Sequence, residues 1–130
     1  MLRGLNDKVK TNALIAPAAL AASTLSAATD LQGKRNFAFL IQVGSFAFTG
    51  VNSLTVTIHE SDTSGGTYAA HAGSGSLVLN DQATQENKVH VLEYKGNKRF
   101  VKLDIVEAGT VSAPMAVSGL CTDNEIEPAQ

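Results

Sequence analysis

The sequence predicts an all-β fold, and within that class an antiparallel β-sandwich. Short segments with alternating apolar residues recur about every 10 to 15 residues, glycine or polar turns separate them, and the body of the chain contains no convincing amphipathic helix. A chain of 130 residues suffices for one hydrophobic core. We expect three parts: residues 1–30 as an extended N-terminal arm, 31–121 as the sandwich domain and 122–130 as a C-terminal tail.

The first expected strands lie in the middle of the chain. Residues 37–43 (FAFLIQV) form an apolar run that ends at Gly44, which suits a strand buried on much of both faces. Residues 54–60 (LTVTIHE) alternate strictly between apolar and polar side chains, which predicts one core face and one solvent face. A polar, glycine-rich connection at 61–68 precedes a short strand at 76–79.

The later strands follow the same pattern. Residues 81–87 (DQATQEN) indicate a polar loop, and the segments 88–94 and 99–106 are predicted to pair as a hairpin. Their connection contains Gly96-Asn97, a dipeptide that suits the positive φ of a tight reversal. A last strand is expected at 115–121.

The N-terminal segment resembles an export signal at first sight. Basic residues precede an apolar stretch at 13–22, but Asp7 lies in the basic region and Pro17 interrupts the stretch. The stretch is also too short to cross a bilayer as a helix, so we expect no signal peptide. For residues 18–26 a helix starting after Pro17 and an extended arm are equally consistent with the composition.

Composition and charge exclude several partners. Ten basic and twelve acidic residues give a net charge of -2, which offers no bulk attraction to nucleic acid or to an anionic membrane. Charged residues make up 17% of the chain, a low fraction, so more of the surface than usual is expected to be neutral or covered. The single cysteine, Cys121, allows no intrachain disulfide and is expected as a small buried hydrophobe.

No constellation of residues predicts catalysis, a metal or a cofactor. His59, His71 and His90 lie in separate segments without metal-ligand spacing. Asp62 lies in a turn that lacks the ligand spacing of a calcium loop, and residues 73–75 (GSG) lack the helix that a phosphate-binding loop requires. We therefore expect a protein that is not an enzyme, with no catalytic residues, no metal site and no cofactor.

Several segments together resemble a known group of proteins. These are 30–33 (DLQG), 54–68 (LTVTIHESDTSGGTY) and 93–103 (EYKGNKRFVKL), within a similarity that spans roughly residues 12–121. They resemble small proteins encoded among the head genes of tailed phages, prophages and gene transfer agents. The resemblance implies a virion component on the capsid surface, namely a capsid decoration or cement protein with a jelly-roll-like sandwich.

The same resemblance implies that the major capsid protein is the partner and that the protein forms a homo-oligomer on the particle, with a trimer as one possibility. Leucine and isoleucine side chains of the arm are the candidate contacts with other subunits: Leu2, Leu5, Leu14, Ile15 and Leu20. In the alternative interpretation, these residues cover the protein's own sandwich.

Other functions remain open at this stage. A head-tail connector, a tail component or a head fibre fits the same resemblance. A carbohydrate-binding or host-adhesion module is an alternative of another class, although the chain has no Trp and two Tyr for stacking on sugars.

Overall fold

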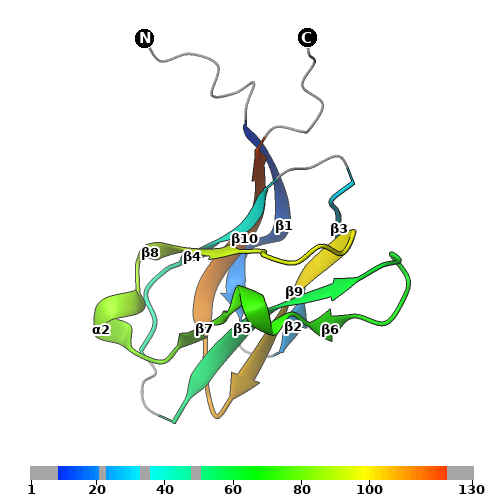
Figure 1. Cartoon of the computed structure of the whole chain (residues 1–130). Coiled ribbons are helices and arrows are strands. Elements are labelled where there is room, and N and C mark those ends of the chain that lie inside the picture. The colour runs from blue at the N-terminus through cyan, green and yellow to red at the C-terminus, as the bar shows by residue number, and fades with distance from the viewer. Residues whose placement is uncertain (1–8, 21–22, 33–35, 48–50, 123–130) are drawn as a thin grey trace, which may run out of the picture.

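The computed structural model describes residues 9–20, 23–32, 36–47 and 51–122. These residues form two antiparallel β-sheets that pack face to face, which confirms the predicted all-β sandwich (Figure 1). The four-stranded sheet has the order β1 (Val9–Leu20), β10 (Ala113–Thr122), β4 (Phe37–Val43) and β8 (Lys88–Glu93).

The second sheet has six strands, several of them short. Its central strands are β9 (Phe100–Ala108) and β5 (Ser53–Ser61). On the outer side of β9 lie β2 (Thr24–Leu25) and β3 (Thr29–Asp30), and on the outer side of β5 lie β6 (Ala69–Ala70) and β7 (Ser76–Leu79).

Alternation along the strands builds the core between the two sheets. In β4 the buried side chains are Phe37, Phe39, Ile41 and Val43, and each of these alternates with a more exposed residue. In β5 and β9 the corresponding fully buried side chains include Val56, Ile58, Leu103 and Ile105. Cys121, at the end of β10, is 6% exposed and belongs to the same core, as the sequence predicts.

The strands pair in a nested order. β1 pairs with β10, β2 and β3 pair with β9, β4 pairs with β8, and β5 pairs with β6 and β7. Two further pairings, β10 with β4 and β9 with β5, join these nested pairs into the two sheets. Most neighbours in a sheet are therefore distant in sequence.

The predicted hairpin between residues 88–94 and 99–106 is wrong. β8 pairs with β4 in one sheet, whereas β9 pairs with β5 in the other. Residues 95–99 therefore cross from one sheet to the other, and among the described glycines only Gly75 and Gly109 have positive φ. The alternation of apolar residues correctly gives the inward face of each strand, but it contains no information on the pairing partner.

The region predicted as an arm is part of both sheets. Residues 9–20 form β1, which pairs along its length with β10, with two register shifts near Pro17. Ala18 to Leu20 lie in this strand and Thr24–Leu25 form β2, so the described residues contain an extended chain and no helix there. The expected boundary at residue 30 thus falls at the end of a paired strand, β3, and strands β1, β2 and β3 within the described segments 9–20 and 23–30 belong to the sandwich.

Two short helical segments lie between strands, and the second of them connects the two sheets. The 3-10 helix η1 (Ala72–Ser74) follows β6, and the single-turn helix α2 (Gln82–Gln85) lies within the segment predicted as a polar loop. Asp81 caps α2, because its carboxylate accepts a hydrogen bond from the backbone N–H of Ala83. No helix in the described part of the chain has the length and hydrophobicity to cross a membrane.

Candidate interaction surface

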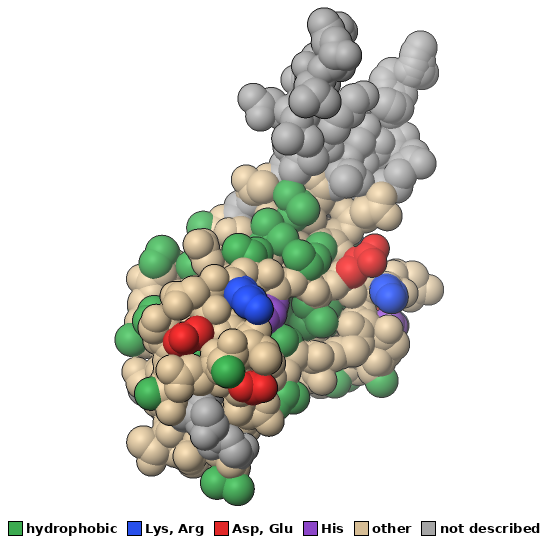
Figure 2. All heavy atoms as spheres, turned by 90° about the vertical axis from the view of Figure 1, so that its left-hand side faces the viewer, with side chains coloured by type: hydrophobic (Ala, Val, Ile, Leu, Met, Phe, Trp, Pro, Cys, Tyr) green, Lys and Arg blue, Asp and Glu red, His purple; other side chains and the backbone are tan. Residues whose placement is uncertain are grey.

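The outward face of the four-stranded sheet carries mainly small and aliphatic side chains. The strand register places the following residues on this face, which we call the aliphatic face: Thr11, Ala13, Ala19, Pro114, Ala116, Ser118, Leu120, Ala38, Leu40, Gln42, Val89, Val91 and Glu93. Val89 and Val91 are 55% and 61% exposed. Figure 2, viewed from the side of β8 and α2, shows hydrophobic side chains gathered below the grey atoms.

Charge is nearly absent from the aliphatic face. Among its described residues, Glu93 at one end is the one ionisable side chain, and Lys88 lies at the margin. A protein surface with few charges loses little hydration free energy when another protein covers it. This face therefore shares one feature of an interface core, the depletion of charged residues, but it contains several alanines and lacks the aromatic anchors of many interfaces.

A shallow depression of about 500 Å³ lies at one end of the aliphatic face. Pro17, Gly44 and Pro114 contribute to its wall together with Val89 and Ala116. A Cβ atom added at Gly44 would lie 3.2 Å from the Cβ of Pro114, so a larger residue at position 44 would press against this wall. The lining combines small residues such as Ala18 and Gly44 with the larger Gln42, Lys88 and Met115.

The outward face of the six-stranded sheet has a different character. His59 Nε2 lies 3.3 Å from a carboxylate oxygen of Asp104, and the ammonium group of Lys102 lies 4.1 Å from the centre of the Tyr68 ring. Exposed hydrophobic residues also occur on this face, but they stand among threonines and charged residues: Leu25, Val78 and Val106. The charged groups of this sheet thus find partners within the molecule.

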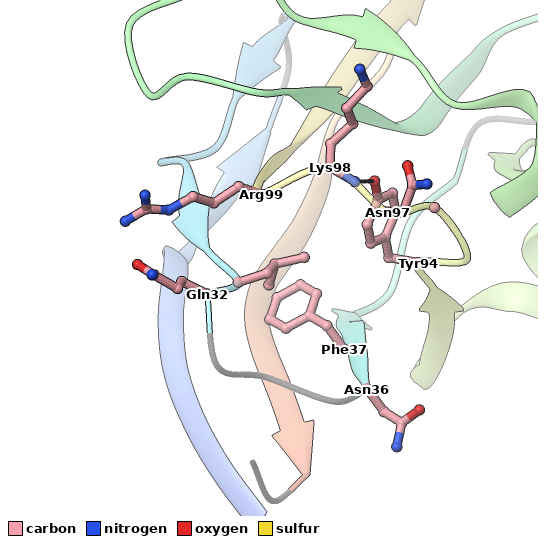
Figure 3. A pocket seen from close by; sticks show the side chains of 9 residues that line it. Gln32, Asn36, Phe37, Tyr94, Asn97, Lys98 and Arg99 are labelled. Carbon is pink, nitrogen blue, oxygen red and sulfur yellow. Dashed lines mark hydrogen bonds between the residues drawn. The ribbon is translucent and has the colours of Figure 1, made fainter. Parts of the chain in front are cut away.

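A polar cluster joins the two sheets at the end of the sandwich near Tyr94. Tyr94 follows β8, and its hydroxyl donates a hydrogen bond of 2.6 Å to Glu60 of β5. The same oxygen accepts a 2.9 Å hydrogen bond from the backbone N–H of Lys98 (Figure 3). Burial and the hydrogen bond to Glu60 raise the pKa of Tyr94 to about 12. The phenol therefore stays protonated at neutral pH and ties the crossing segment to both sheets.

A pocket of about 370 Å³ lies beside this cluster. The rings of Phe37 and Tyr94 face it, whereas the amide groups of Gln32 and Asn36 point away from the space between the rings (Figure 3). Both rings are nearly buried, with 4% and 8% exposure. The polar groups do not converge on one point as a small-molecule site requires, so this pocket is a weaker candidate than the aliphatic face.

Two basic residues of the crossing segment, Lys98 and Arg99, have partners in the protein. Lys98 Nζ lies 2.9 Å from Asp62, an ion pair that raises the pKa of Lys98. Arg99 forms two hydrogen bonds of 2.8 Å with the carboxylate of Asp30, and its guanidinium carbon lies 5.0 Å from the centre of the Phe100 ring. The sequence segment 94–103 thus combines a turn anchored by Tyr94 with two surface ion pairs.

The three histidines have separate contacts and do not form one site. His59 contacts Asp104, His71 Nδ1 lies 2.8 Å from the hydroxyl of Ser74, and His90 Nε2 lies 3.1 Å from the carbonyl oxygen of Gln85. In the described part of the chain no three His, Cys, Asp or Glu residues come together in an arrangement that could hold a metal ion.

The predicted contact residues of the arm lie partly in the core. Leu20 is 9% exposed and belongs to the core, and Leu14 and Ile15 are half-buried and pack against it. The positions of these three residues agree with the alternative interpretation, in which they cover the protein's own sandwich. Leu2 and Leu5 lie outside the described residues.

The residues of the aliphatic face were not predicted as contacts. One signal for them is present in the sequence, because the run FAFLIQV is apolar on one alternating set and, apart from Gln42, on the other. Its second set, Ala38 and Leu40, points outward onto the aliphatic face. When a strand is apolar on both faces and one of these faces lies outside the core, the outer face is a candidate docking surface.

Comparison with known proteins adds no assignment: no family model matches the chain, and a search of the curated proteins finds no match.

Proposed function

We propose that this protein is a non-enzymatic structural component of a phage-type virion, a capsid decoration or cement protein that binds the lattice of the major capsid protein. In this proposal the aliphatic face of the four-stranded sheet is the surface that contacts the shell. The resemblance of segments 30–33, 54–68 and 93–103 to phage head proteins suggests the class of partner.

The observation that carries the proposal is the near absence of charge from the described side chains of one sheet face. Folding requires the inward face of β4 and β10 to be apolar, but it places no such requirement on Leu40, Ala116 and Leu120, which point outward. Covering these residues with another protein removes apolar surface from water at little desolvation penalty. A binding role explains their composition, which the protein's own core does not.

The nested strand order supports the same proposal. First strand with last, second with seventh, third with sixth and fourth with fifth is the pairing order of a jelly roll, if β2 with β3 and β6 with β7 each count as one interrupted strand. Jelly rolls occur in viral capsid proteins and also in lectins. We therefore interpret the sandwich as a jelly roll, and the fold is compatible with a virion protein without specifying one.

A shell lattice multiplies weak contacts. Each copy has to offer only a modest apolar patch, because a copy that bridges neighbouring capsid subunits binds two linked sites at once. Many such copies then resist the separation of subunits. A sandwich with one open face that carries few charges suits this role better than a deep pocket does.

The test places one charge on each of the two outward faces. Ala116→Glu introduces a carboxylate at the centre of the aliphatic face, in the central strand β10, and Thr55→Glu introduces the same group in the central strand β5 of the other sheet. We expect the Ala116 variant to lose co-sedimentation with shells of the major capsid protein and the Thr55 variant to retain it. Thermal denaturation of both variants checks that each one folds.

Three results separate the interpretations. Loss of shell binding by Thr55→Glu alone would assign binding to the other face. Retained binding by both folded variants would refute the aliphatic face as the contact, and absence of shell binding by the unmodified protein would refute the decoration role. Copy number per particle then distinguishes related roles, since hundreds of copies indicate decoration, whereas six or twelve indicate the neck or tail.

A further inference from the structure

The four sheet edges of the described structure differ in how they are protected against pairing. β1 contains Pro17 and two register shifts, which interrupt the regular row of backbone groups. The edges formed by β2 with β3 and by β6 with β7 consist of strands of two to four residues. β8 has none of these features: it is six residues long, contains no proline and keeps an unbroken register with β4.

Hydrogen-bond geometry identifies the backbone groups at the free edge of β8. The N–H of Tyr94 donates to the carbonyl oxygen of Phe37 over 3.0 Å, and these residues continue the register in which Glu93 lies opposite Ala38. Because hydrogen-bonded and non-hydrogen-bonded residues alternate in an antiparallel ladder, Leu92 and His90 also bond to β4. The backbone groups of Val89, Val91 and Glu93 therefore point to the side where no described strand pairs with β8.

Two exposed β-branched residues occupy this edge. The side chains of Val89 and Val91 are 55% and 61% exposed and lie on the aliphatic face. Valine favours strand pairing, and an exposed regular edge with valine is the arrangement that soluble proteins avoid unless something pairs with it. The edge and the aliphatic face form one continuous surface.

We propose that two copies of this chain pair through the free edges of β8, antiparallel and about a two-fold axis, so that their four-stranded sheets join into one continuous sheet. Residues with outward backbone groups must pair with each other and keep their side chains on one face. In one register Val91 lies opposite Val91 of the second copy. In the other register Val89 of each copy lies opposite Val91 of the other. In both registers the aliphatic faces of the two copies become a single wider face.

The charges at the strand ends favour a second copy in this orientation. β8 begins at Lys88 and ends at Glu93. Antiparallel pairing brings the basic end of each strand next to the acidic end of the other, and the two-fold axis repeats this attraction. Parallel pairing would place like charges together. Since the two side chains leave opposite faces of the sheet, the attraction is between strand ends and not a direct ion pair.

The size of the contact sets its expected strength. Six paired residues bury less area than a standard protein interface, so the dimer is expected to dissociate on dilution. Sedimentation equilibrium of the isolated protein across a wide concentration range, without any capsid shell, measures this equilibrium. A protein that stays monomeric up to millimolar concentration would overturn the proposal.

Val91→Pro is the sharpest variant. Proline removes the N–H of residue 91, which points away from β4, and thereby leaves the internal ladder intact. We expect the dissociation constant to rise by about tenfold or more, because each copy loses a hydrogen bond and the ring obstructs the edge. Val91→Thr is the matched control: it keeps the N–H and the branched Cβ, and it should dimerise like the unmodified protein. An equal effect of both variants contradicts edge pairing.

Charge reversal tests whether the partner strand is β8 itself. Glu93→Lys makes both ends of the strand basic and should weaken the dimer, whereas the double variant Lys88→Glu, Glu93→Lys should recover it. No recovery in the double variant would refute pairing of β8 with itself. This inference extends the proposed shell-binding function but fails separately from it, because Ala116→Glu should still dimerise and Val91→Pro should still bind shells, with lower affinity.

Discussion

The two outward faces of the sandwich show what folding requires of a sheet and what it does not. On the six-stranded sheet, His59 pairs with Asp104 and Lys102 lies over the Tyr68 ring, so polar groups find partners inside the molecule. On the four-stranded sheet, small and aliphatic residues face outward with one carboxylate, Glu93, among them. Both sheets contribute apolar side chains to the common core. The difference outside therefore reflects what each face meets after folding.

The largest expected effect comes from comparing an inward-facing side chain with an outward-facing side chain of the same strand. Phe39 and Leu40 are adjacent in β4, but Phe39 is fully buried and Leu40 lies on the aliphatic face. Phe39→Ala should lower the free energy of unfolding by about 3 to 5 kcal/mol, because it leaves a cavity between the sheets. Leu40→Ala should cost about 1 kcal/mol or less. Urea denaturation of both variants measures the difference, and equal losses would contradict an outward-facing Leu40.

A second prediction concerns a buried polar residue that is hydrogen-bonded to the six-stranded sheet. Ser26 is buried, and its hydroxyl accepts a 2.9 Å hydrogen bond from the backbone N–H of Leu103 in β9. Ser26→Ala leaves this buried N–H without that acceptor and should lower the free energy of unfolding by about 1 to 3 kcal/mol. Ser118→Ala, on the aliphatic face, is the control and should have little effect on urea denaturation.

A third prediction uses the polar cluster that joins the sheets. The pKa of Tyr94 rises from about 10 in the unfolded chain to about 12 in the folded protein, so the folded state favours the protonated phenol. This contribution to stability is complete below pH 10 and is lost as the pH rises through 12. Tyr94→Phe should remove this part of the alkaline loss and the absorbance change of its phenolate. It should also cost about 1 kcal/mol at neutral pH.

The smallest expected effect tests the polar face. Asp104→Asn removes the carboxylate beside His59 and should cost about 0 to 1 kcal/mol, since the side chains are partly exposed to solvent. The loss should shrink at high salt concentration, where exposed charges are screened. A large loss that is independent of salt would mean that this contact supports the sheet more strongly than an exposed ion pair does.

Local pattern predicted the central strands well because each of them has one face in the common core. The apolar run at 37–43 coincides with β4, and the alternation at 54–60 lies within β5. The pairing partner of each strand could not be predicted in the same way. Residues 88–94 and 99–106 have suitable turn residues between them, but a connection of the same length also crosses between sheets, and Tyr94 with Glu60 stabilises that crossing.

The candidate site was harder to predict than the fold. The large side chains of Leu14, Ile15 and Leu20 were predicted as contacts with other subunits. A large aliphatic side chain in an edge strand, however, packs against the core as readily as against a partner. The aliphatic face instead combines alanines with single small, polar and aliphatic residues from four strands, and these indicate little until the register shows that they lie together. Only the tertiary arrangement turns these scattered small residues into one surface.

The pairing of Val9 with Thr122 has a consequence for how the protein acquires its structure. Among the described strands, β1 is synthesised first, yet β10, its one neighbour among them, is synthesised last. Until β10 has been made, β1 lacks a template, and closing so long a loop is slow. We expect the four-stranded sheet to form only after β10 has left the ribosome, and folding to take milliseconds to seconds.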